Sequence, residues 1–300
     1  MSIIQQAVDK LARARLNEAD DPRANGKDRS GTTVGIFSGP DNRRGMAASE
    51  IQRHRIVVDR KKLTDVGLLV PEEFERQTTA EFRRIKRPLL RNAFGAGAAT
   101  MRRGNLIVVT SALPGTGKTF TTLNLALTMA RERDLSVLLV DGDVAKPHLS
   151  HMLGLHRQAG LLDYLARDAA VIEDFIVDTD VPGLAVLPAG KPHPEATELL
   201  SSPRMQDLVE RLARHRDRWI VLFDSPPLLV TTESQVLTGL MEQIVLVVEA
   251  DSSPRPAVQQ AIDLLDSSKA INLVLNKTQR GFMDRYDGYY GANYEDDAQD

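Results

Sequence analysis

From about residue 104 onward, short runs of Val, Ile and Leu alternate with amphipathic stretches. The apolar runs predict strands and the amphipathic stretches predict helices. Continuous apolar strands joined by helical crossovers favour a mostly parallel sheet with helices on both faces, and so an α/β fold. The expected strands are 106–110, 136–140, 184–187, 219–223, 243–248 and 272–275, and the expected helices are 118–131, 161–167, 195–214, 232–240 and 255–267.

The first seventy residues follow a different pattern. Apolar positions from Ile3 to Leu16 have helical spacing, which predicts a helix over 2–18, and the polar, Gly-rich residues 19–49 predict a flexible linker. Residues 55–59 predict a short strand or extended segment. Pro71 followed by three glutamates predicts a helix that ends near Leu90. We therefore expect an N-terminal helix and basic linker over 1–70, a folded domain over 71–279 and an exposed tail over 280–300.

Composition narrows the possible functions. Residues 1–100 hold 19 Lys and Arg against 13 Asp and Glu, which favours either a solvated arm or contact with an anionic surface. The basic residues lack interleaved aromatics, so nucleic-acid binding is not expected. The chain has no cysteine and no apolar run near the ~20 residues that span a bilayer. We expect a soluble, cytoplasmic protein that reaches a membrane only at its periphery or through a partner.

A glycine-rich loop lies between the first predicted strand of the domain and the helix that follows it. Ala112-Leu-Pro-Gly-Thr-Gly-Lys-Thr119 has the order strand, turn, helix of a P-loop. Gly115 and Gly117 allow backbone amides to surround phosphates, Lys118 is placed for the β- and γ-phosphates, and the Thr119 hydroxyl for Mg²⁺. Ala112 stands where this loop usually has its first glycine. The loop predicts a P-loop NTPase fold that binds ATP and Mg²⁺.

Three carboxylates follow predicted strands. Asp141 and Asp143 end one apolar run, and Asp224 ends another. Because ligands of open α/β sheets bind outside the carboxyl ends of the strands, these side chains should converge on the P-loop. We expect Thr119, Asp141, Asp143 and Asp224 to hold Mg²⁺, and Asp141 or Asp143 to orient an attacking hydroxyl. The alternative is that these residues only cap the helices that follow.

These motifs together resemble the bacterial tyrosine kinases of exopolysaccharide systems, most closely the soluble autokinases of exosortase-type loci, over about residues 70–300. Ala112–Thr119, Leu138–Asp143 and Ile220–Asp224 resemble the family's Walker A, Walker A′ and Walker B motifs. The resemblance implies catalysis by Lys118, Asp141 and Asp143. It also implies nucleotide binding by Pro114, Gly115, Thr116, Gly117, Lys118, Thr119, Phe120, Asn276 and Lys277.

The resemblance extends to assembly. Glu81, Arg84 and Arg87 match the Glu-x-x-Arg-x-x-Arg motif through which family members form homo-oligomeric rings, and their spacing places them on one helix face. It also implies a separate membrane activator of the polysaccharide co-polymerase type and a counteracting tyrosine phosphatase. Ala145 departs from the family pattern, which has a basic residue there. Lys146 follows it and could supply the phosphate contact instead.

Four of the five tyrosines lie in the last fifteen residues, among glycine and acidic residues. On composition alone this segment is equally suited to partner binding or to accepting phosphate. With the kinase resemblance, Tyr286, Tyr289, Tyr290 and Tyr294 are the expected acceptors, phosphorylated by a neighbouring copy in the ring. Phosphorylation adds about −1.5 to −2 charges per tyrosine, and we expect repulsion from the acidic residues beside them to weaken the ring.

Two other classes share a P-loop. A Min- or Par-type positioning ATPase carries a signature Lys where this chain has Leu113, followed by Pro114, and the chain lacks the membrane-binding C-terminal helix of that class. A nucleotide-gated adaptor without kinase activity is disfavoured by the complete set of Lys118, Thr119 and the three aspartates.

Overall fold

Eight strands form one sheet in the order β1-β4-β5-β3-β6-β2-β7-β8. The structure is a computed structural model and describes residues 55–95, 101–214 and 218–278. All strand pairs are parallel except β4 with β5. The strands are β1 (Arg55–Ile56), β2 (Leu106–Ser111), β3 (Ser136–Asp141), β4 (Val177–Thr179), β5 (Leu184–Leu187), β6 (Trp219–Asp224), β7 (Gln243–Glu249) and β8 (Ala270–Asn276).

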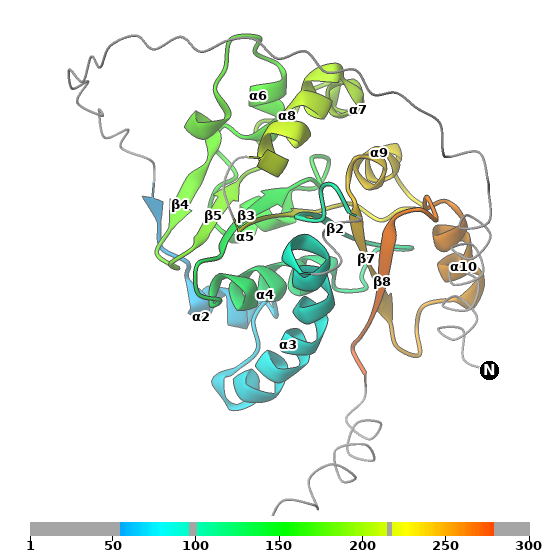
Figure 1. The fold of residues 1–300 in the computed structure, drawn as a ribbon. Helices are drawn as coiled ribbons and strands as arrows, with labels where there is room; N and C mark the ends of the chain where they lie inside the picture. The colour runs from blue at the N-terminus through cyan, green and yellow to red at the C-terminus, as the bar shows by residue number, and fades with distance from the viewer. Residues whose placement is uncertain (1–54, 96–100, 215–217, 279–300) are drawn as a thin grey trace, which may run out of the picture. The chain divides into compact units, whose positions relative to one another are not determined.

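Helices cover both faces of the sheet (Figure 1). On one side lie α3 and α4, and on the other lie α8 and α9. The helices are α2 (Arg60–Asp65), α3 (Glu72–Phe94), α4 (Lys118–Ala130), α5 (His148–Met152), α6 (Leu161–Leu165), the 3-10 helix η2 (Ile172–Phe175), α7 (Ala196–Ser201), α8 (Pro203–Arg214), α9 (Thr232–Leu240) and α10 (Arg255–Asp263). The predicted α/β class and mostly parallel sheet are confirmed.

The central strands β2, β3 and β6 are buried along their whole length apart from the first residue of β3. Their side chains alternate between the two helical layers, which is why these strands read as continuous apolar runs. Helix α4 packs on this sheet in contact with α3, and Phe82 and Leu89 of α3 are buried. The two central crossovers, through α4 and α9, run to opposite sides of β2 and leave the carboxyl ends of β2, β3 and β6 side by side.

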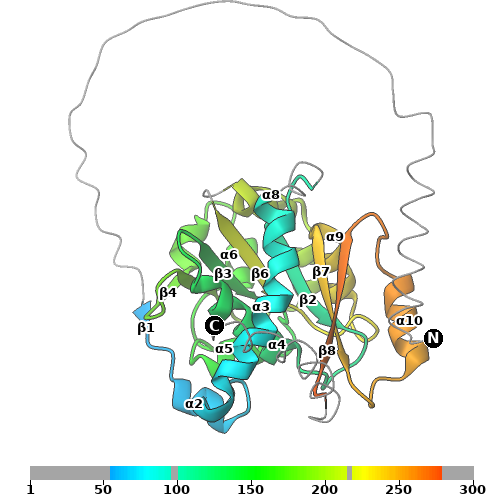
Figure 2. The ribbon, with the colours of Figure 1, turned by 60° about the horizontal axis from the view of Figure 1, so that its bottom comes forward.

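The folded domain begins before the predicted boundary at residue 70. Strand β1 pairs with β4, and Val58, Leu63 and Leu68 are buried in the core. The Val58 amide donates a hydrogen bond of 2.8 Å to Asp180. Residues 55–70, predicted to belong to the linker, therefore form the outer edge of the sheet and cover the core beside α3 and α4 (Figure 2).

Three helix predictions needed correction. The helix expected over 255–267 ends at Asp263. The helix expected over 195–214 is two helices, because Ser202 is extended before Pro203 and proline disfavours a helical residue ahead of it. Helix α3 continues past Leu90 to Phe94, through Pro88, because its buried face still packs on the core. The predicted helix over residues 2–18 and the tail over 280–300 lie outside the described residues.

Candidate nucleotide and phosphoryl-transfer site

The P-loop joins β2 to α4 and has the backbone of a phosphate cradle. Gly115 and Gly117 have φ angles of 84° and 91°, in the left-handed region that favours glycine. A Cβ on Gly117 would also collide with the side-chain amide of Asn276. That amide donates 2.8 Å to the Thr116 carbonyl, and the Lys277 ammonium donates 2.8 Å to the Gly115 carbonyl. Hydrogen bonds from the end of β8 therefore fix two carbonyls of the loop.

A cavity of about 660 Å³ lies over this loop. Most of the predicted nucleotide residues line it: Gly115, Gly117, Lys118, Thr119, Phe120, Asn276 and Lys277. Pro114 is exposed and Thr116 is buried, and neither lines the cavity. Gly67, Leu68 and His148 also line it and were not predicted as site residues. Lys146, considered from the sequence for a phosphate contact, lines it as well. The size and lining suit a nucleotide whose phosphates lie on the P-loop.

Asp224 ends β6 directly behind the P-loop. Its carboxylate accepts hydrogen bonds from the Thr119 hydroxyl at 2.8 Å and the Thr122 hydroxyl at 2.9 Å. Burial raises the pKa of Asp224 to about 6, against the lowering effect of these two donors and of Lys118. The predicted metal residues Thr119 and Asp224 are thus in direct contact.

Asp141 ends β3 beside Asp224, paired in register with it. The Ser150 amide and hydroxyl donate to one of its oxygens at 2.7 and 2.6 Å. Among the described residues, its other oxygen has no hydrogen-bond partner, although the side chain is fully buried. Burial raises the pKa of Asp141 to about 7, and the charge of Asp224 adds to that effect. A buried carboxylate oxygen without a partner is costly unless a ligand, water or ion satisfies it.

Asp143 differs from the other two aspartates because it lines the cavity, which Lys118 also lines. Its carboxylate accepts 3.1 Å from the Lys146 amide, which fixes the turn after β3. Burial raises the pKa of Asp143, and Lys118 and Lys146 oppose this. Burial also lowers the pKa of Lys118, while Asp224 and Asp143 raise it. Of the two candidate bases predicted from sequence, only Asp143 faces the space where a substrate can enter.

The donors present fit Mg²⁺ bound partly by phosphate. This ion prefers oxygen ligands and usually takes one or two carboxylates together with phosphates and water. A hydroxyl and three carboxyl groups at adjacent strand ends, one with an unsatisfied oxygen, supply that chemistry. Within residues 55–95, 101–214 and 218–278, no group of three or more His, Cys, Asp or Glu is arranged to hold a metal by itself.

The predicted assembly motif lies on α3. Arg84 and Arg87 are exposed, and Glu81 accepts a hydrogen bond of 3.2 Å from Gln77. Between them, Lys86 is buried and donates 2.9 Å to the Thr128 carbonyl while pairing with Glu132 at 2.5 Å. Lys86 thereby fixes α3 against the end of α4 and turns the motif away from the core. None of the helices in the described ranges is long and apolar enough to cross a bilayer.

The fold and the loop define the chain as a P-loop NTPase, and residues 104–278 match the family model of an AAA domain. The putative tyrosine-protein kinase CapB of Staphylococcus aureus is 30% identical over 189 residues, which cover 62% of this chain and 81% of CapB. The putative kinase EpsB of Ralstonia nicotianae is 34% identical over 198 residues, or 63% of this chain. The chain belongs to the bacterial tyrosine kinase family.

Two further comparisons agree with this assignment. The crystal structure of the chimerical protein CapA2B2 superimposes with a TM-score of 0.60 and 25% identity, covering 76% of this chain and 94% of that one. The succinoglycan biosynthesis transport protein ExoP of Rhizobium meliloti is 31% identical over 192 residues, or 62% of this chain. The chain spans only about a quarter of EpsB and of ExoP, at 26% and 24% of their lengths.

Proposed function

We propose that this chain is an ATP-dependent protein-tyrosine kinase that phosphorylates the tyrosines at the C-terminus of a neighbouring copy of itself. The observation that carries this proposal is Asp143, a carboxylate that opens into the same cavity as Lys118 and the P-loop. A nucleotide switch needs the P-loop and the carboxylates behind it. A carboxylate at the open side of the γ-phosphate position is what a kinase needs to receive a hydroxyl group.

The reaction would transfer the γ-phosphoryl group of ATP to the phenol oxygen of a tyrosine. The bond between the γ-phosphorus and its bridging oxygen breaks, a bond to the phenol oxygen forms, ADP leaves, and the phenol proton passes to the Asp143 carboxylate. Lys118 and the P-loop amides stabilise the charge on the phosphoryl oxygens. Thr119, Asp224 and Asp141 are proposed to hold Mg²⁺, which neutralises phosphate charge when bound. Asp141 would act from the neighbouring strand, where it pairs in register with Asp224.

The acceptors would be Tyr286, Tyr289, Tyr290 and Tyr294. The fifth tyrosine, Tyr164, is 3% exposed and packs edge-on against Phe175 under the Arg204 guanidinium. It cannot reach a second active site without local unfolding. All accessible acceptors would therefore belong to the C-terminal segment.

Assembly would bring this segment to the neighbour's site. The exposed Arg84 and Arg87 on α3 are the proposed ring contacts, with Glu81 as the acidic partner. The succinoglycan protein among the relatives supports a role in exopolysaccharide synthesis or export. We propose a membrane co-polymerase as activator and a tyrosine phosphatase as the opposing enzyme. Phosphorylation would weaken the ring, and an unchanged oligomer size after full phosphorylation would contradict that step.

The test uses three chains incubated with Mg²⁺ and ATP, with phosphotyrosine located by mass spectrometry. Wild type should label the C-terminal tyrosines, and a chain with all four changed to Phe should carry no phosphotyrosine. The matched control is Tyr164→Phe, which keeps the buried ring and should label like wild type. Hydrolysis of ATP without phosphotyrosine, even with a candidate membrane activator present, would instead support a Min- or Par-type switch.

A further inference from the structure

The segment that follows Asp143 is basic on its exposed side. Between residues 144 and 162 the sequence contains no Asp or Glu. Five basic side chains of this segment are exposed. We call them the basic loop surface: Lys146, His148, His151, His156 and Arg157.

The backbone beneath this surface is fixed. The His148 amide donates 2.6 Å to the Lys146 carbonyl, and Leu149 and Leu155 point inward and are at most 1% exposed. The imidazoles of His151 and His156 stack with ring centroids 4.9 Å apart and planes within 7°. The basic groups are therefore held in place on one short helix and its flanking turns.

The basic loop surface is continuous with the candidate active site. Lys146 and His148 line the same cavity as Lys118 and Asp143. His151 lies one helical turn beyond His148 on α5, and His156 stacks on it. The basic loop surface therefore begins at the cavity that Asp143 lines.

The proposed acceptor segment has the complementary charge. Residues 286–300 contain five acidic residues and no basic one. Tyr294 is followed directly by Glu295, Asp296 and Asp297. In an extended chain these three carboxylates lie about 3.5 to 11 Å beyond the tyrosine, within reach of groups on the rim of the cavity.

We propose that the basic loop surface binds the acidic residues beside the acceptor tyrosine of a second copy of this chain, and so makes acidic-flanked tyrosines, above all Tyr294, the preferred substrate. This rests on the proposed kinase function and adds a specificity determinant to it. Lys277, by contrast, is engaged by Gly115 and Glu249 and serves the P-loop. Lys146 and Arg157 would make the principal contacts with these carboxylates, because lysine and arginine keep their charge at neutral pH.

The experiment measures binding and transfer separately. The kinase is the full chain with its four C-terminal tyrosines changed to Phe, so that only added peptide is labelled. One peptide has the sequence of residues 291–300, and its matched partner carries Glu295→Gln, Asp296→Asn and Asp297→Asn. Fluorescence anisotropy gives Kd in the presence of Mg²⁺ and a non-hydrolysable ATP analogue, and phosphate incorporation gives KM and kcat.

The acidic peptide should bind about tenfold more tightly than the neutral one, as several exposed ion pairs allow, and the difference should shrink at high salt. The KM should rise by the same factor for the neutral peptide, with kcat within about twofold. Arg157→Glu should reduce the discrimination three- to fivefold. Arg133→Glu is the matched control, because it makes the same charge reversal at another exposed arginine, at the other end of the sheet, and should leave the discrimination intact.

Charge exchange sharpens the test. A Lys146→Glu, Arg157→Glu chain should bind a peptide with lysines at positions 295–297 better than the wild-type peptide. Equal Kd values for acidic and neutral peptides on the wild-type surface would overturn the proposal, whether or not phosphate is transferred. Phosphatidylserine vesicles that bind wild type but not Arg157→Glu, with no discrimination between peptides, would overturn it in favour of a membrane contact. Discrimination in anisotropy without transfer would uphold docking and reject only the kinase function.

Discussion

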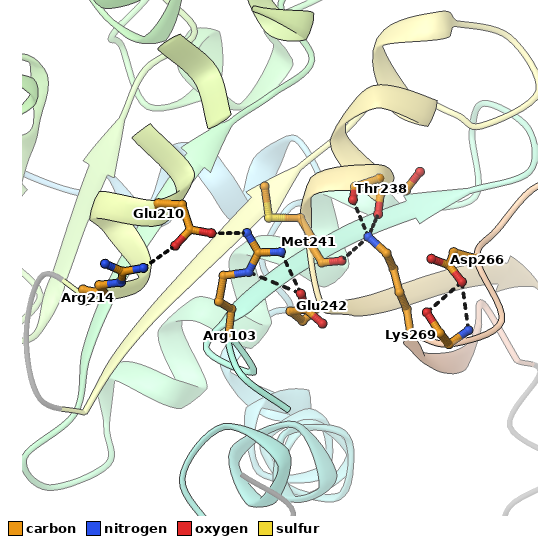
Figure 3. Close-up of polar contacts among 10 residues, drawn as sticks. Arg103, Glu210, Arg214, Thr238, Met241, Glu242, Asp266 and Lys269 are labelled. Carbon is orange, nitrogen blue, oxygen red and sulfur yellow. Dashed lines mark hydrogen bonds and ion pairs between the residues drawn. The ribbon is translucent and has the colours of Figure 1, made fainter. Parts of the chain in front are cut away.

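The two ends of the sheet differ in how their charged side chains are paired. At the amino ends of the strands, Arg103 pairs with Glu242 and Glu210 at 2.8 Å each (Figure 3). At the carboxyl ends, the aspartates stand side by side, one of them with an oxygen that no group among the described residues satisfies. Charges at the first end are satisfied by the protein alone. At the second end, one oxygen of Asp141 lacks a partner among the described residues, whereas Asp224 and Asp143 accept hydrogen bonds from the protein.

Two half-buried lysines show the contrast most directly. Lys269 precedes β8, and its ammonium donates to the carbonyls of Thr238, Gly239 and Met241, which closes the end of α9 (Figure 3). Within the described part of the chain, the Lys118 ammonium has no hydrogen-bond partner and lies near Asp224 and Asp143 only as charges. Burial lowers the pKa of both lysines. The first lysine stabilises the fold, whereas we propose that the second binds a ligand.

The largest expected effect comes from the available lysine. Lys118→Ala should reduce phosphotyrosine formation by about 10²- to 10³-fold, because the charge on the transferred phosphoryl group loses its main cationic partner. Its free energy of unfolding should stay within about 1 kcal/mol of wild type, since no hydrogen bond is lost. Quantitative phosphotyrosine detection and urea unfolding check both parts. A collapse of stability in this variant would show that Lys118 is structural, like Lys269.

The second prediction concerns the effect of the buried Asp141 carboxyl group on stability. The pKa of Asp141 is near 7 in the folded chain and near 4 when unfolded, so ionisation favours the unfolded state between these values. This contribution destabilises the fold as pH rises from about 4 to about 7 and then stays constant. Asp141→Asn should therefore gain about 1–3 kcal/mol over wild type at pH 8 and about nothing at pH 4. Urea unfolding across this range measures the difference, and parallel curves for the two chains would contradict it.

At the opposite end of the sheet we expect the reverse pattern. Lys269→Met keeps the aliphatic stem but leaves three carbonyls of the α9 terminus without their donor. The free energy of unfolding should fall by about 1–3 kcal/mol. Phosphotyrosine formation, measured well below the melting temperature, should remain within about twofold. A kinase defect as large as that of Lys118→Ala would mean that the two ends of the sheet are functionally coupled.

The smallest expected effect is at the edge of the site. Asn276→Ala removes the hydrogen bond to the Thr116 carbonyl and should raise the KM for ATP about fivefold, as the loss of about 1 kcal/mol implies. The kcat should change little. Initial-rate kinetics at varied ATP concentration separate the two constants. An unchanged KM would show that β8 does not hold the P-loop for nucleotide.

The strands of the central sheet were predictable because burial on both faces demands continuous apolar runs. Strand β5 has its predicted bounds, Leu184–Leu187. Each of the other predicted strands differs from its predicted bounds by one to three residues. Three short elements were not predicted: α2 with six residues, α5 with five and β4 with three. Segments this short carry too little periodicity to be recognised. The antiparallel β4 also gave no local signal, because its pairing depends on β5 and β1.

The sequence predicted which residues meet at the site, because this follows from the sheet topology. Strand-terminal aspartates and a P-loop must meet at one edge of a parallel sheet, and Asp143, Asp224 and Lys118 do so. Sequence left open which aspartate faces the cavity, because residues two apart on a strand share a face only while the strand continues. Strand β3 ends at Asp141, so the turn carries Asp143 into the cavity while Ser150 retains Asp141 inside. Leu68 also lines the cavity, but it belongs to residues 55–70, whose packing had no sequence signal.

The central claim is that one copy of the chain phosphorylates the C-terminal tyrosines of another. The most direct measurement mixes Lys118→Ala, which keeps its tyrosines, with the chain whose four C-terminal tyrosines are Phe, in Mg²⁺ and ATP. A mass tag distinguishes the two chains. We predict phosphate on Tyr286, Tyr289, Tyr290 or Tyr294 of the Lys118→Ala chain and on neither chain alone. Hydrolysis of ATP by the mixture with no phosphotyrosine, even with a membrane activator present, would contradict the account.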